Sequence, residues 1–196
     1  MGAGILPTTI QNKKLYFLFG KENKYADTPG WSDFGGGTDN KETHMQTAIR
    51  EGGEELTGFL GSDDDLKRML KRGTYNIDGS NKYRMFLFYM PYDEALPHYC
   101  NNNQRFIQKH LDPEIIQETK IFEKAEIRWV CEDELTKMHS QFRSYFQNII
   151  DKLIEERKKI AKFMMKKYKK CSKRNVTMRH KRRRSGLKTR NTRRRF

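Results

Sequence analysis

Three glutamates in the stretch REGGEE have a spacing that can do chemistry. Glu51, Glu54 and Glu55 occupy positions i, i+3 and i+4, which share one face if the segment is an α-helix. Carboxylates so close together repel one another unless a cation lies between them. Mg²⁺ and Mn²⁺ prefer oxygen ligands, and Mg²⁺ keeps water molecules that a phosphate can replace. The spacing therefore favours a divalent-metal site, although a solvated acidic helix face has the same pattern.

Glycines and an arginine accompany this acidic face. Gly35, Gly36 and Gly37 precede it, and we expect them to form a turn that comes close to a ligand, because glycine has no side chain to block the approach. Arg50 has a planar guanidinium that can orient a neighbouring carboxylate, with Glu42 the obvious candidate. A glycine turn before a carboxylate-lined helix predicts a cradle for a metal-bound diphosphate.

The same stretch resembles a known family motif. It is similar to the Nudix box, G-x5-E-x7-R-E-U-x-E-E-x-G-U, where U is a bulky apolar residue. The fixed positions are matched by Gly36, Glu42, Arg50, Glu51, Glu54 and Glu55. The stretch departs from the box at Gly52, Thr57 and Gly58, and Gly58-Phe59 looks like the final G-U displaced by one residue. We therefore expect an altered helix exit with unaltered metal ligands.

The resemblance extends over about residues 3–155, because the downstream EIRWVCEDEL looks like the late strand and short helix of Nudix domains. It implies a Nudix fold and hydrolysis of a nucleoside diphosphate linked to another group, with Mg²⁺ or Mn²⁺ as cofactor. By position it implies that the metal ligands are the Gly35 carbonyl, Glu51, Glu54 and Glu55. Family members often add a carboxylate before the late strand, and our candidate is Glu123, with Glu118 and Glu126 as rivals. The catalytic residues implied are Glu54, Glu55 and Arg50, and spacing alone does not separate general base from ligand.

Local patterns predict the elements that position these residues. We expect strands at 3–7, 13–22 and 123–131, a hairpin formed by 73–78 and 82–92, and helices at 43–57, 63–72, 103–111 and 132–138. Thr43 is the expected N-cap of the first helix and Gly58 its C′ residue. From Gln141 onward, apolar residues at helical spacing predict one long helix. The fold class expected is α/β, a mixed β-sheet sandwiched between α-helices, with a long C-terminal helix and a basic tail.

The charge divides the chain into two parts. Residues 157–196 hold 20 of the 40 lysines and arginines and none of the 25 acids, so residues 1–156 carry a net charge of −5. We interpret 1–156 as the Nudix-like domain and 157–196 as a polybasic helix extension that ends in a disordered tail beyond about Cys171. Such a tail binds polyanions, above all nucleic acid, and also suits a nuclear localisation signal.

The tail directs the choice of substrate. A long RNA gains from it and a small nucleotide gains little, so the sequence most resembles the mRNA-decapping Nudix enzymes, cellular or viral, which release a methylated guanosine diphosphate and leave a 5′-monophosphate RNA. We expect Trp31 to stack on the cap base, ahead of Phe34, Tyr16, Tyr25 and Tyr92. In the tail we expect Lys181, Arg182, Arg183 and Arg184 to contact the RNA. The alternatives are a pyrophosphatase for diphosphoinositol polyphosphates or dinucleoside polyphosphates, and an inactive Nudix domain that binds RNA.

Cysteine usage and hydropathy bear on the compartment. Cys100, Cys131 and Cys171 are scattered and form no CxxC pair, which favours a reducing, intracellular setting, cytoplasmic or nuclear. We expect no secretory leader and no membrane partner, because the apolar runs are too short to cross a bilayer.

Overall fold

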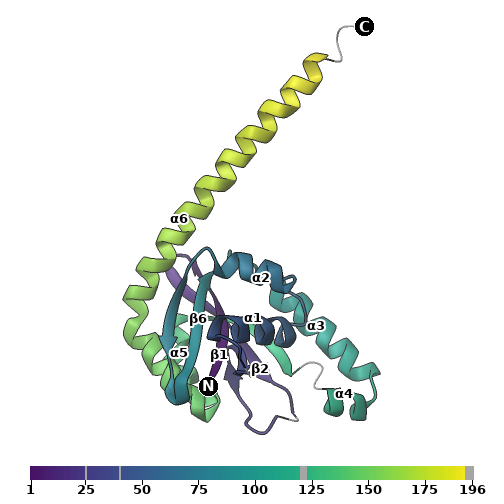
Figure 1. Ribbon diagram of the computed structural model, residues 1–196, viewed down its shortest axis with the longest axis vertical. Helices are drawn as coiled ribbons and strands as arrows, with labels where there is room; N and C mark the ends of the chain where they lie inside the picture. The colour runs from purple at the N-terminus through teal and green to yellow at the C-terminus, as the bar shows by residue number, and fades with distance from the viewer. Residues whose placement is uncertain (25, 40, 120–122, 193–196) are drawn as a thin grey trace.

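The protein is built around a mixed β-sheet with helices on both faces (Figure 1). The computed structural model describes residues 1–24, 26–39, 41–119 and 123–192; the side chains of Asn81, Gln117, Thr119 and residues 173–192 are not described. The strands are β1 (Gly2–Gln11), β2 (Lys14–Glu22), β3 (Trp31–Ser32), β4 (Phe34–Gly37), β5 (Thr74–Asp78), β6 (Tyr83–Tyr89) and β7 (Lys124–Cys131). The helices are α1 (His44–Glu55), α2 (Asp63–Leu70), α3 (Ala95–His110), α4 (Pro113–Thr119), α5 (Leu135–Met138) and α6 (Gln147–Thr192).

The central strand β1 organises the sheet. Within the described residues the seven strands follow the path β3-β2-β1-β6-β5, with β4 paired to β1 and β7 paired to β2. The β1–β6 pair is parallel, and the other pairs are antiparallel. The expected mixed sheet is therefore confirmed.

Two hydrophobic cores lie on the two faces of this sheet. Alternation along the strands divides them: Ile5 and Leu18 belong to the core that packs against α1, α2 and α3, while Leu6 and Phe17 belong to the core that packs against α5 and α6. All four side chains are buried. The sheet is thus sandwiched between two helical layers, as the sequence predicts.

The glycine run is a strand, which corrects the expected turn. Gly35, Gly36 and Gly37 pair with Gly4, Ala3 and Gly2 of β1, and none of the three has a positive φ. A Cβ on Gly36 would lie 2.6 Å from the Glu51 carboxylate. These glycines therefore allow strand β4 to lie against its neighbours, and the chain turns later, between β4 and α1.

Helix α1 begins as predicted and ends one residue differently. Thr43 is the N-cap, and it forms a capping box with Gln46. At the other end Thr57 has φ +48°, and its N–H donates to the Glu54 carbonyl at 3.0 Å. Thr57 is therefore the C′ residue, and Gly58 follows it at C″. Thr57 takes the left-handed position directly after the helix, so the glycine of the motif falls one residue later, at Gly58.

The long C-terminal helix starts later than its apolar pattern suggests. Phe142 does not belong to it, because that segment pairs with Trp31, whose carbonyl accepts the Arg143 N–H at 3.0 Å. Two short 3₁₀ segments, His139–Gln141 and Ser144–Phe146, flank this bridge, and α6 follows from Gln147. The first part of α6 packs on the sheet, and the rest extends away from the body (Figure 1).

The boundary at 156/157 stays a prediction. The disordered tail expected beyond about Cys171 does not agree with helix α6, which is continuous to Thr192. Helix α3 also starts earlier than predicted, because Pro97 falls in its first turn, where proline is tolerated. Within the described part of the chain, no helix combines the length and apolar character that crossing a bilayer requires.

Candidate active site

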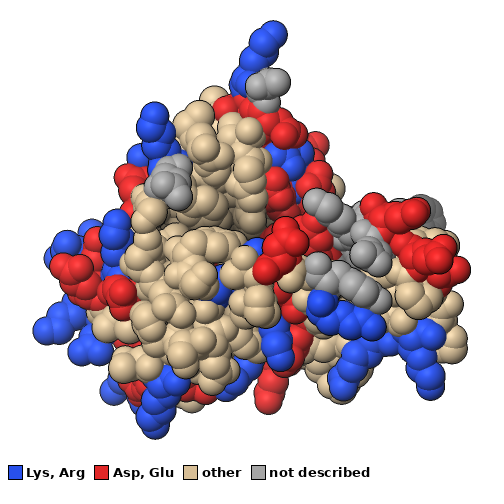
Figure 2. Space-filling view, turned by 90° about the horizontal axis from the view of Figure 1, so that it is seen from below, with Lys and Arg blue, Asp and Glu red and all other residues tan. Residues whose placement is uncertain are grey.

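A cleft of about 630 Å³ lies beside strand β4 and helix α1 and contains the predicted acidic residues. Its lining includes Glu51, Glu54 and Glu55 from α1, Gly35–Gly37 from β4, and Glu123 immediately before β7. In the view from below, acidic side chains gather where the main body meets the part that carries α4 (Figure 2). The structure therefore brings together in one cleft the acids that the sequence separates by up to about 70 positions.

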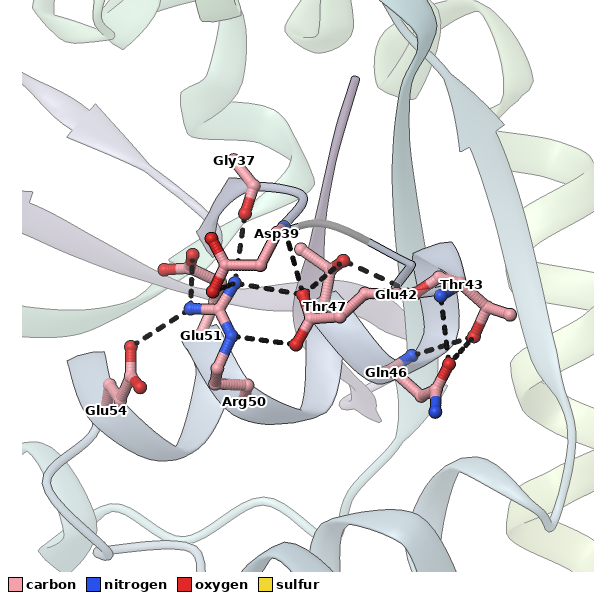
Figure 3. Close-up of polar contacts among 9 residues, drawn as sticks. All are labelled: Gly37, Asp39, Glu42, Thr43, Gln46, Thr47, Arg50, Glu51 and Glu54. Carbon is pink, nitrogen blue, oxygen red and sulfur yellow. Dashed lines mark hydrogen bonds and ion pairs between the residues drawn. The ribbon is translucent and has the colours of Figure 1, made fainter.

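Arg50 braces the start of the site. Its Nε and Nη2 donate to the two oxygens of Glu42 at 3.0 and 3.1 Å, and Nη2 also donates to the Gly37 carbonyl at 3.0 Å (Figure 3). These bonds connect α1 to the loop after β4, as expected for a fork-shaped guanidinium. The bond from Arg50 lowers the pKa of Glu42 to about 2. Arg50 is thus a positioning residue.

Arg50 also holds two of the predicted metal ligands. Its Nη1 donates to Glu51 at 2.8 Å and to Glu54 at 3.3 Å. Burial raises the pKa of Glu51, with the nearby charges of Glu54 and Glu123 acting in the same direction against Arg50. The Glu54 side chain is 61% exposed and the most accessible of the three α1 carboxylates, against 14% for Glu51 and 4% for Glu55.

Glu55 lies deepest and has both oxygens engaged. Its Oε2 accepts the Gly35 N–H at 2.8 Å, and its Oε1 is 3.1 Å from the Lys124 ammonium. Burial raises the pKa of Glu55 well above its usual range. Burial alone would lower the pKa of Lys124, but Glu55 and Glu22 outweigh it and the pKa of this lysine is raised. The structure therefore distinguishes Glu54 from Glu55, which the sequence could not do.

Sequence patterns did not predict several residues that lie in the cleft or directly behind it. Glu22 ends β2, lines the cleft and accepts from Arg143 at 2.7 Å. Lys124 is the first residue of β7, which also holds Glu126 and Arg128, and Tyr145 lies in the 3₁₀ segment before α6. A glutamate at the end of an aromatic strand was the one local signal for Glu22; nothing local pointed to Lys124 or Tyr145.

Trp31 does not lie in the cleft. It is 6% exposed and belongs to the core beside Phe19 and Phe142, so the expected stacking role does not fit this position, because a buried ring offers no open face. Phe34 is buried as well, and Tyr16 and Tyr92 pack against each other away from the cleft lining. Tyr25 lies outside the described residues, as do the side chains of Lys181, Arg182, Arg183 and Arg184.

The donor set of the cleft fits a hard divalent ion. It offers carboxylates from Glu51, Glu54, Glu55 and Glu123 and the backbone of β4, which are oxygen ligands of the kind that Mg²⁺ and Mn²⁺ take. Among the described residues, no three histidine, cysteine or acidic side chains yet converge closely enough to hold an ion. The reason is visible in the contacts, because Glu51 and Glu54 turn toward Arg50 while Glu55 bonds to Lys124. An ion bound by Glu51 and Glu54 would share these carboxylates with Arg50 or displace its Nη1.

The comparisons with known proteins found similar solved structures. No model of a known family matches the sequence, and no curated protein does. Similar solved structures include a Nudix hydrolase from M. smegmatis, RenU, with 17% identity over 82% of this chain and 87% of that chain and a TM-score of 0.48. A C. elegans Ap4A hydrolase shares 17% identity over 78% of this chain and 93% of that chain, with a TM-score of 0.44. A bifunctional NMN adenylyltransferase/ADP-ribose pyrophosphatase from Francisella tularensis shares 19% identity over 79% of this chain and 41% of that chain, with a TM-score of 0.48.

Proposed function

We propose that this protein is a divalent-metal-dependent hydrolase of phosphoanhydride bonds and that its substrate is a capped RNA. The observation that carries the hydrolase assignment is the single cleft in which Glu51, Glu54, Glu55 and Glu123 meet strand β4. A bound Mg²⁺ or Mn²⁺ would polarise a phosphate oxygen and stabilise the diphosphate that leaves. The residues that would hold it are Glu51, Glu54 and Glu123, with Glu55 and the Gly35 carbonyl beside them.

Glu54 is the best candidate for the general base. A base must reach a water molecule in the cleft, and Glu54 is exposed with one weak bond to Arg50 at 3.3 Å. Glu55 is less suitable, because Gly35 and Lys124 already bond to its two oxygens. Glu54 would accept the proton of the attacking water, while the bonds between Arg50 and Glu42 hold α1 and the preceding loop in their relative positions.

The cationic helix supports RNA as substrate. Helix α6 rises about 1.5 Å per residue, so Lys181 lies roughly 50 Å along it from Gln147. The end of α6 that is next to the cleft is Gln147, because Arg143 and Tyr145 line the cleft just before it. A small nucleotide cannot reach from the cleft to the basic cluster at 181–184, whereas a long RNA can.

Tyr145 supports recognition of a base. It is 52% exposed, and the Arg143 guanidinium lies 4.8 Å from its ring centroid. Tyr145 lines both the acidic cleft and a neighbouring cavity of about 320 Å³, and Gly35–Gly37 also line both. An exposed aromatic ring beside a diphosphate site can stack on a nucleobase, a role that an inositol ring does not require.

The test of the hydrolase uses cap-labelled RNA with Mg²⁺ or Mn²⁺. The wild type is expected to release methylated GDP, and Glu54→Gln is expected to lose roughly 10²-fold or more in kcat. Equal rates for the wild type and Glu54→Gln would show that Glu54 does not belong to the active site. Turnover of a diphosphoinositol polyphosphate without turnover of RNA would show that capped RNA is not the substrate. RNA binding without any product would favour an inactive domain that binds RNA.

Two further variants test the substrate. Replacing Lys181, Arg182, Arg183 and Arg184 by glutamine should weaken binding of long capped RNA and reduce its salt slope by up to about 3, at about 0.7 per contact with a single strand. The same variant should hydrolyse a cap dinucleotide at the wild-type rate. Tyr145→Ala should weaken GDP binding by about 5- to 150-fold, which corresponds to 1–3 kcal/mol of stacking, and leave pyrophosphate binding unchanged. Tyr99→Ala is the matched control, because Tyr99 is 66% exposed on α3 and outside the cleft lining.

A further inference from the structure

Lys124 is a buried lysine at the back of the candidate active site. Its side chain is 0% exposed, although it belongs to β7, at the edge of an acidic cleft. The facing strand β2 makes room for it, since a Cβ on Gly20 would lie 2.8 Å from the Lys124 Cδ. A lysine is rarely buried in this way unless its charge is paired.

The ammonium of Lys124 has an acceptor for each of its three N–H groups. The acceptors are Glu22 Oε1, Ser32 Oγ at 2.9 Å and Glu55 Oε1 at 3.1 Å. An ammonium group donates three hydrogen bonds, so this environment satisfies it completely. The two carboxylates are themselves buried, with side-chain exposures of 5% for Glu22 and 4% for Glu55.

The same contacts fix the two carboxylates. Glu55 is held between Lys124 and the Gly35 N–H, and Glu22 is held between Lys124, Ser32 and Arg143. Two buried carboxylates with no cation between them would be strongly destabilising. If residue 124 were neutral, the oxygens of Glu22, Ser32 and Glu55 would form an oxygen-lined position of the kind that a hard divalent ion occupies.

We propose that Lys124 is a built-in cation of the metal site. Its ammonium occupies, between Glu22 and Glu55, a position that a divalent ion would take if the lysine were absent. The exchangeable ions are then confined to the outer carboxylates, Glu51, Glu54 and Glu123. This inference rests on the proposed function, since it assumes that the outer carboxylates bind a divalent ion.

The experiment counts bound Mn²⁺ by electron paramagnetic resonance in wild type, Lys124→Met and the control Lys14→Met. Methionine has about the length of the lysine stem and no charge. Lys14 pairs with Asp133 on the surface at 2.5 Å, with 54% of its side chain exposed, so its loss tests for a general effect of removing a lysine. We expect Lys124→Met to bind one Mn²⁺ more than the wild type at saturation, and Lys14→Met to bind the wild-type number.

Each outcome bears on the inference. A Lys124→Met protein that folds only when Mn²⁺ is added, as followed by circular dichroism, would also support it. An unchanged number of ions in Lys124→Met would overturn it, and so would a variant that stays unfolded at every Mn²⁺ concentration. A wild type that binds no Mn²⁺ would instead count against the proposed function, so the two failures are distinguishable.

Discussion

Replacing Gly52 by alanine should destabilise the protein, whereas the same change at its neighbour Gly53 should not. Both glycines lie in α1, where alanine is favoured over glycine by about 1 kcal/mol. A Cβ at Gly52 would lie 2.4 Å from Cδ1 and 2.8 Å from Cγ1 of Ile5, which is 0% exposed in the central strand. A Cβ at Gly53 would meet the carboxylate oxygen of Asp63 at 2.8 Å, the far end of a side chain that can move.

The magnitude follows from two opposing terms. Overpacking a buried contact costs about 1–3 kcal/mol, and contacts this short belong to the upper part of that range. After the helix gain is subtracted, Gly52→Ala should lower the free energy of unfolding by about 1–2 kcal/mol. Gly53→Ala should raise it by up to about 1 kcal/mol. Urea unfolding, followed by circular dichroism and extrapolated to water, measures both values.

A double-mutant cycle tests the cause. Ile5→Val removes the Cδ1 methyl and should cost about 0.5–1.5 kcal/mol in the wild type. In the Gly52→Ala background it should cost less or stabilise, because it removes Cδ1, the closer of the two Ile5 atoms that the new Cβ would meet. Equal stability of Gly52→Ala and Gly53→Ala, or additive effects of Ile5→Val and Gly52→Ala, would refute the close packing of α1 on β1.

Three further predictions concern ionisable groups. Arg50→Lys should return the pKa of Glu42 from about 2 toward its usual range, as measured by NMR titration. The same change should lower kcat roughly 10²-fold, because a single ammonium cannot reproduce the two parallel bonds that position α1. Burial raises the pKa of Asp33 from 3.8 to about 7. Between these two pH values the folded protein keeps a proton that the unfolded chain releases. The free energy of unfolding therefore falls as the pH rises through this window. The difference in stability between wild type and Asp33→Asn, measured with a chelator present, should therefore change by at most about 1.4 kcal/mol per pH unit from pH 4 to 7 and be flat above; a difference independent of pH would contradict this. Burial raises the pKa of Cys100 to about 11, so at pH 8 an alkylating reagent followed by mass spectrometry should label the half-buried Cys171 and leave Cys100 unmodified until the protein unfolds.

Local sequence was enough for the features that depend on neighbours along the chain. The spacing of Glu51, Glu54 and Glu55 places them on one helix, and Thr43 caps that helix, because helical periodicity and capping act over three or four residues. Apolar patterns were likewise sufficient for β1, β2, β5, β6 and β7 and for the two-sided sheet, but not for the short strands β3 and β4. The contact between Arg50 and Glu42, eight residues apart, was also within reach of the sequence.

Tertiary structure decided which other groups join that helix. Lys124 and Glu22 are 102 residues apart and meet because β2 and β7 pair, a contact that no local pattern announces. The burial of Trp31 follows from its bridge to Phe142. The glycine run became a strand because β1 was available to pair with it. The sequence by itself therefore determined the acidic helix and the charge of the tail, and the pairing of distant strands determined which cations and which aromatic ring surround the acids.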